Sequence, residues 1–191
     1  MPPLTPELAQ IEQQLVAVKA EASSLVNGLK ITQFNWRPDG RGWSVAECLL
    51  HLNMVGHRYV NELDAVLAEA RAQGRTAAGP FGYGMFGKWI LENTEPPPKR
   101  KFKARRPFRP TEDQPVTAVL PTFLHLQDQL SRQLEQASGL DLAHIKVPAP
   151  GFGPVRLNLH ITLAWIAAHE RRHLWQARQV LGHAAFPRPD F

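Results

Sequence analysis

Apolar residues recur at alternating intervals of three and four along four separate stretches of the chain, which is the pattern of an amphipathic helix. The first stretch begins at Thr5, and the second covers about residues 45–71. The third covers residues 118–137, and the fourth covers about residues 158–181. No stretch shows the strict alternation of a half-buried strand. The pattern therefore predicts an all-α protein built on four long helices.

Residues that favour helix ends support these boundaries. Thr5 is followed by Pro6, and proline is favoured at the first helical position. Ser44 stands three residues before Glu47, which is the capping-box pattern. Gly182 follows the fourth stretch, and glycine commonly ends a helix. Three of the four helices thus carry their own start or stop signal.

The connection between the second and third helices, residues 73–117, is the least regular part of the chain. It contains Gly-Pro-Phe-Gly-Tyr-Gly from residue 79 and three consecutive prolines from residue 96. A short helix is expected near residues 86–92. A connection this long inside a compact domain is usually functional or mobile.

Positive charge is concentrated in one part of that connection. Residues 99–109 contain seven lysines and arginines and no acidic residue. The formal net charge of the whole chain is +5, so removing these seven charges leaves a net charge of −2 elsewhere. Three interpretations stay open: a solvated loop, a phosphate-binding patch, or a rim that attracts an anionic small molecule. For the last two, the candidate anion-binding residues are Arg105 and Arg106.

Residues 169–173 read His-Glu-Arg-Arg-His, which places two imidazoles one turn apart on one face of the fourth helix. The same letters match the H-E-x-x-H helix of zinc proteases. Such a protease needs a third ligand downstream, where only His183 and Asp190 could bind a metal and no room is left for another helix. The sequence therefore argues against a protease, and a third ligand must come from upstream.

His51 is the best upstream candidate, because it lies about 40° from the apolar position Val55 on the second helix and so faces the core. A single inward histidine is more often a hydrogen-bonded core residue than a ligand, but a pair spaced by four makes a metal site the better hypothesis. His160 lies about 180° from His169, and His57 about 120° from His51. The predicted ligands are His51, His169 and His173.

Several neighbours of these histidines have competing interpretations. Glu170 and Gln176 are the candidates for a catalytic role, although Glu170 is expected to make a hydrogen bond behind the site or a surface salt bridge. Arg171 and Arg172 are expected to be solvated. Cys48 is expected to be a small buried apolar residue rather than a thiolate ligand. The tryptophans near the helix ends and on the fourth helix are assigned to packing: Trp36, Trp43 and Trp165.

The order of these motifs resembles the DinB-like (damage-inducible, YfiT-related) metalloenzyme superfamily. The resemblance covers roughly residues 5–72 and 115–182. It implies a four-helix bundle in which three histidines on two helices hold a divalent metal. Members include bacillithiol and mycothiol transferases, a thiol-dependent maleylpyruvate isomerase and many proteins of unknown activity. The matching elements are Trp36-Arg37-Pro38, Trp43-Ser44-Val45-Ala46-Glu47, His51, His169, His173 and Gln176.

The resemblance favours an enzyme that activates a low-molecular-weight thiol for transfer to an electrophilic small molecule. One alternative is a metal-dependent hydrolase that activates water. Another is a non-enzymatic protein that binds metal or nucleic acid, although two aromatic residues among the charges do not make a base-stacking platform, so a nucleic-acid partner is not favoured. Three imidazoles suit zinc or nickel as the cofactor and also admit iron, copper or manganese.

Composition sets the remaining expectations. With 191 residues, 43% of them hydrophobic, residues 1–191 are expected to form one domain with residues 73–117 as an inserted loop region. No apolar run reaches the length of a membrane span, so no membrane partner is expected. Cys48 is the only cysteine, so a cytoplasmic protein without an intrachain disulfide is expected. The resemblance suggests a homodimer.

Overall fold

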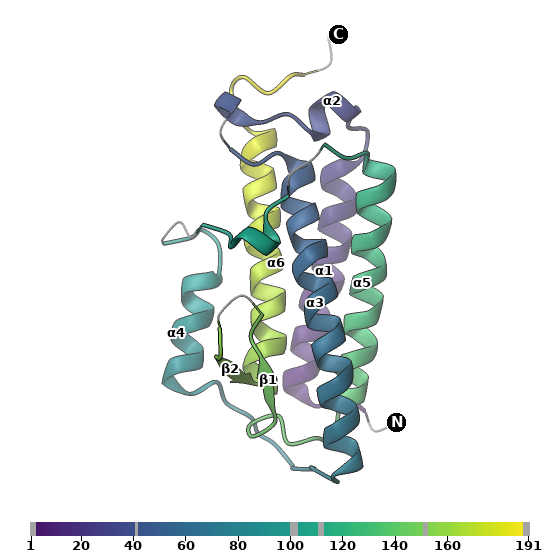
Figure 1. The fold of residues 1–191 in the computed structure, drawn as a ribbon, viewed down its shortest axis with the longest axis vertical. Helices are drawn as coiled ribbons and strands as arrows, with labels where there is room; N and C mark the ends of the chain where they lie inside the picture. The colour runs from purple at the N-terminus through teal and green to yellow at the C-terminus, as the bar shows by residue number, and fades with distance from the viewer. Residues whose placement is uncertain (1–2, 41, 100–102, 111–112, 151–152, 189–191) are drawn as a thin grey trace.

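The computed structural model describes residues 3–40, 42–99, 103–110, 113–150 and 153–188. The predicted all-α four-helix bundle is confirmed. Its four long helices lie side by side (Figure 1): α1 Pro6–Val26, α3 Val45–Ala72, α5 Val116–Ala137 and α6 Leu159–Leu181. The shorter elements are α2 Ile31–Phe34, the 3-10 helices η1 Pro38–Gly40 and η2 Arg106–Phe108, α4 Gly84–Thr94, and the strands β1 Lys146–Pro148 and β2 Arg156–Asn158.

Side-chain caps begin three of the four long helices, and those of α1 and α3 stand at the predicted positions. Ser44 Oγ accepts the Glu47 N–H at 3.1 Å, and Glu47 Oε2 accepts the Ser44 N–H at 2.8 Å, which completes the capping box of α3. Thr5 Oγ1 accepts the Leu8 N–H of α1, and the Asn158 side chain caps α6. The third long helix begins at residue 116, two residues before the predicted start.

The bundle core consists of two apolar clusters, one toward each end of the helices. On α3, the buried apolar residues from 45 to 52 belong to one cluster, and those from 55 to 70 belong to the other. On α6, the change falls between residues 167 and 174. Polar side chains are buried near this level, halfway along the bundle: His51, Asn53, Gln127, Glu170 and His173. The predicted metal ligands therefore belong to a polar layer between two apolar clusters.

The long connection contains the expected short helix. α4 spans Gly84–Thr94, slightly longer than the predicted residues 86–92, and packs against α6 (Figure 1). Gly87 makes this close contact possible, because a Cβ atom there would lie only 2.7 Å from Ile161 Cδ1. α4 thus covers a side of α6 that an isolated four-helix bundle would leave to solvent.

The structure corrects the expectation that the chain forms no strand. β1 and β2 pair as an antiparallel hairpin with Val147 opposite Leu157. Each strand has three residues, too few for an alternating pattern to be recognised in the sequence. The hairpin leads directly into α6, because Asn158 ends β2 and caps the helix.

Candidate metal centre

The structure brings together the three histidines that the sequence singled out. His51 comes from α3, and His169 and His173 come from successive turns of α6. One ligand nitrogen from each side chain lies within 4.8 Å of the other two. The Nε2 atoms of His51 and His169 are 3.3 Å apart. Two nitrogens bound tetrahedrally to zinc at their usual bond length would lie about 3.3 Å apart, so this donor set fits a metal ion.

In two of the imidazole rings, a hydrogen bond at Nδ1 leaves Nε2 free to bind a metal. His51 Nδ1 lies 2.7 Å from the carbonyl oxygen of Phe108, and a carbonyl can only accept, so the ring donates from Nδ1. In the same way His173 Nδ1 lies 3.1 Å from Gln176 Oε1. In a neutral ring the proton on Nδ1 leaves a lone pair on Nε2. Partners of this kind commonly orient metal-binding histidines.

Burial keeps the three imidazoles neutral. It lowers the pKa of His51 below its usual value. The pKa values of His169 and His173 lie well below the usual value, first because of burial and then because of neighbouring imidazoles and the positive charge of Arg172. The neutral imidazole is the form that binds a metal, so the ligands need lose no proton near pH 7.

Two tryptophans form walls around the imidazoles, a role beyond the packing that the sequence suggested. Trp165 stacks on His169 with ring centres 4.6 Å apart and planes 15° apart. Trp43 stacks on His173 with centres 5.6 Å apart and also contacts His51. These contacts restrict ring rotation and exclude water from the ring faces. The contact between Trp165 and His169 could have been inferred from the sequence, because Trp165 precedes His169 by one helical turn and so shares its face of the helix.

Glu170 is turned away from the surface, which corrects the alternative of a surface salt bridge. Its Oε1 accepts a hydrogen bond of 2.8 Å from Gln127 Nε2 on α5, and Oε2 has no hydrogen-bond partner among the described residues. Burial raises the pKa of this carboxyl to about 8. The described side chains that can jointly hold a metal are the three histidines alone.

Arg171 and Arg172 are not solvated, contrary to expectation. Arg171 forms an ion pair with Glu95 at the end of α4 and donates to Gln14 on α1 at 2.9 Å. Arg172 Nη1 donates to the Asn93 carbonyl at 3.0 Å. The two arginines between the histidines thus fasten α4 to α6, because α4 covers the side of the helix from which they project.

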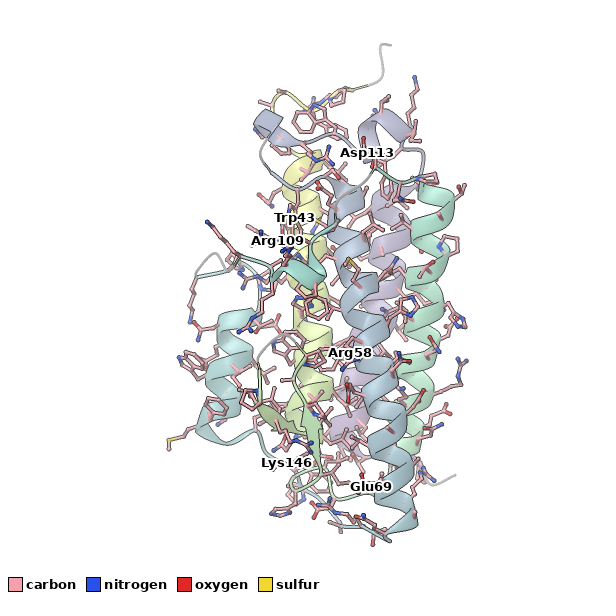
Figure 2. All side chains as sticks on the ribbon, viewed as in Figure 1. Trp43, Arg58, Glu69, Arg109, Asp113 and Lys146 are labelled. Atoms are coloured by element: carbon pink, nitrogen blue, oxygen red, sulfur yellow. The ribbon has the colours of Figure 1, made fainter. Side chains whose placement is uncertain are left out.

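The basic segment of the connection reaches the site through its backbone. η2 packs against α3, and its Phe108 supplies the carbonyl that orients His51. The side chains of Arg105, Arg106 and Arg109 are exposed around this contact. Figure 2 shows Arg109 and Trp43 on this side of the bundle. Arg100 and Lys101, which belong to the same charge run, lie outside the described residues.

The other histidines lie elsewhere, as predicted. His160 is buried and stacks on Tyr83 with ring centres 4.2 Å apart. His144 pairs with Asp141, and His183 contacts Trp36. His57 and His125 are exposed. Cys48 is buried as predicted, and burial raises the pKa of its thiol.

Replacing Gln176 with leucine should weaken metal binding by roughly 10- to 100-fold, as is common when the partner of a metal-binding histidine is lost. The amide orients His173 without itself belonging to the donor group. Titration with a chromophoric chelator as competitor measures the affinity. Gln179→Leu, at an exposed position on the same helix, is the matched control. Equal affinities for the two variants would contradict an orienting role for Gln176.

Comparison with known proteins identifies the family and the fold. The sequence matches the family model of the DinB superfamily over residues 14–177. No curated protein sequence matches it. Among solved structures, the chain is similar to YfiT from Bacillus subtilis, described as a probable metal-dependent hydrolase with an unusual four-helix bundle topology. The identity is 15%, the TM-score is 0.59, and the match covers 94% of this chain and 89% of YfiT. The chain belongs to the DinB superfamily.

Proposed function

We propose that the protein is a metal-dependent enzyme in which His51, His169 and His173 hold a divalent metal, and that it activates a low-molecular-weight thiol for transfer to an electrophilic small molecule. The observation that carries the proposal is the convergence of three neutral imidazole nitrogens from two helices. Zinc and nickel suit this donor set best, and iron and manganese are further candidates. A metal held by three neutral ligands keeps its full charge and would lower the pKa of a thiol or water that binds beside them.

The nearby carboxylates support a thiol rather than water as the nucleophile. Glu47 Oε2 accepts hydrogen bonds from Arg37 at 2.9 Å and from the Ser44 N–H. Glu170 is hydrogen-bonded to Gln127 on α5. Glu47 is thus engaged by other partners, and burial raises the pKa of Glu170 to about 8, so Glu170 largely keeps its own proton near pH 7 and is a poor acceptor for a proton from water. A thiol loses its proton near neutral pH more readily than water does, so it needs less help from a base.

The proposed reaction is a substitution at carbon. The thiol sulfur attacks the electrophile, a sulfur–carbon bond forms, and the bond from that carbon to the leaving group breaks with its electron pair. The thiol proton passes to solvent. The chain orients the ligands through Phe108 and Gln176, and Trp43 and Trp165 keep the ring faces dry.

Metal-dependent hydrolysis is the second candidate, because YfiT is described as a probable metal-dependent hydrolase and shares the fold. To distinguish thiol transfer from hydrolysis, metal-free protein is loaded with each divalent metal in turn. Two activities are then measured: the conjugation of a panel of thiols to monochlorobimane, and the cleavage of a nitrophenyl ester in the absence of thiol. Thiol transfer predicts metal-dependent conjugation that His169→Ala abolishes. Ester cleavage without conjugation would favour the hydrolase, and the absence of both would favour a binding protein.

Chelating the metal should leave the helical circular dichroism of the protein almost unchanged at room temperature. Two apolar clusters stabilise the bundle without the ion, unlike a zinc finger, whose folding depends on its metal. A thermal scan should show a lower Tm after chelation, because a bound ligand stabilises the folded state. Loss of the helical signal on chelation would make the metal structural.

Reversing the charge of Arg105 and Arg106 to glutamate should weaken binding of an anionic thiol roughly tenfold while metal content stays the same. Both side chains are exposed on the segment whose Phe108 carbonyl orients His51, so they can attract an anion toward the site. The Km for an anionic and for a neutral thiol measures the effect, and Arg132→Glu on α5 is a control. Equal changes for both thiols would contradict an electrostatic rim.

A further inference from the structure

One face of α4 packs on the bundle, and the opposite face is exposed to solvent. Its inner face meets α6 through Gly87. Its outer face exposes three large apolar side chains: Met85 at 91%, Phe86 at 61% and Trp89 at 59% of their full surface. Phe86 and Trp89 stack with ring centres 6.3 Å apart. The three residues lie within about 100° around the helix axis, so they form one continuous patch.

The fold fastens α4 with this patch facing outward. The ion pair of Glu95 with Arg171 and the hydrogen bond from Arg172 to Asn93 hold its C-terminal end on α6. The close contact at Gly87 holds its N-terminal half. α4 therefore cannot turn its apolar face inward without losing these contacts. Large apolar side chains gathered on a surface usually mark an interaction site.

Exposed Lys88 lies on α4 itself, and further positive charge follows the helix along the chain. Residues 84–109 contain eight basic residues and two acidic ones, whereas the formal net charge of the whole chain is +5, so the remainder is close to neutral. Of the two acids, Glu95 is paired with Arg171. Figure 1 shows α4 on the outer side of α6, with the C-terminal end of α4 toward η2. The exposed basic side chains of this region are Lys88, Lys99, Lys103, Arg105, Arg106 and Arg109.

We propose that the outer face of α4 and the exposed basic side chains just named form a docking surface for an anionic phospholipid bilayer. Tryptophan and phenylalanine insert readily at the level of lipid headgroups, and an exposed apolar helix face binds there by burying its side chains. Lysines and arginines beside it add roughly 1 kcal/mol each near an anionic surface. None of the described helices is long and apolar enough to cross a membrane, so the protein would lie on the surface.

Charge and area distinguish this partner from two others. If α4 paired with α4 of a second copy, the symmetric contact would bring two basic segments together, and three side chains offer too little area for a stable dimer. A nucleic acid would match the charge but would leave Met85 and Phe86 without an apolar partner. Of these three partners, the anionic bilayer is the one that matches both the charge and the apolar patch.

Cosedimentation of the 191-residue chain with lipid vesicles tests the proposal. The protein should bind vesicles that contain phosphatidylglycerol much better than vesicles of phosphatidylcholine alone, and added salt should weaken binding. Phe86→Ser with Trp89→Ser, and separately Lys99→Glu with Lys103→Glu, should each lower the partition coefficient roughly tenfold. The matched control is Val16→Ser with Ile31→Ser, which removes comparably exposed apolar side chains from α1 and α2. It should bind like the unaltered protein.

His169→Ala should bind vesicles as the unaltered protein does, so a failure of the proposed metal chemistry would not affect this result. The proposal is overturned if anionic vesicles do not bind the protein, or if the α4 double variant binds as well as the control. It is also overturned if the α4 variant changes only the self-association of the protein. A further contradicting outcome is a protein that does not bind vesicles but binds a DNA oligonucleotide, with the charge variant abolishing that binding.

Discussion

Protein carrying His51→Ala, His169→Ala or His173→Ala should retain little metal after dialysis, with affinity reduced more than about 100-fold. Loss of an orienting partner alone costs 10- to 100-fold, and loss of a ligand should cost more. The prediction is sharpest for His51, because it comes from a different helix and lies outside the H-E-x-x-H letters. Elemental analysis of protein purified without a histidine tag gives the metal content, and circular dichroism shows whether the fold is intact.

His57→Ala is the matched control for His51, because both lie on α3 and the His57 side chain is exposed. It should keep the metal content of the unaltered protein. A full equivalent of metal in a folded His51→Ala protein would overturn the assignment. A loss of metal in His57→Ala as well would indicate that the ion binds without a defined donor set.

The histidine cluster could be predicted from the sequence because helical geometry fixes it. Residues four apart share a face of a helix, so His169 and His173 had to project together once the fourth stretch was helical. The apolar stripe of the second helix then showed that His51 faces inward. The four long helices, the caps of α1 and α3 and the inward direction of the three histidines follow from such local rules, whereas the bundle arrangement was implied by the family resemblance.

The surroundings of the site could not be predicted, because they depend on segments distant in the sequence. The carbonyl that orients His51 belongs to Phe108 in the irregular connection, and no periodicity indicates its position. Arg171 was expected to be solvated because a helix in a plain bundle has an outer face. α4 covers that face of α6, so Arg171 instead pairs with Glu95.

Replacing Glu170 with glutamine should remove a loss of folding stability that the carboxyl causes as the pH rises above about 4.5. Burial raises the pKa of Glu170 to about 8 in the folded protein, against an ordinary value of 4.5. Its proton therefore stays on in the folded state while the unfolded chain releases it. The contribution of Glu170 to the free energy of unfolding therefore falls as pH rises from about 4.5 to 8, by at most roughly 1.4 kcal/mol per pH unit, and this loss stops above pH 8.

Glutamine cannot ionise, and its Oε1 can still accept the hydrogen bond from Gln127. Urea unfolding of metal-free Glu170→Gln and of the unaltered protein should therefore give similar stabilities near pH 5. Near pH 8 the variant should be more stable by a few kcal/mol. The buried histidines add an opposite slope, because their lowered pKa values favour the folded state as pH rises toward about 6.5, but both proteins contain them. The difference between the proteins isolates Glu170, and a difference that stays constant with pH would show that its carboxyl ionises normally in the core.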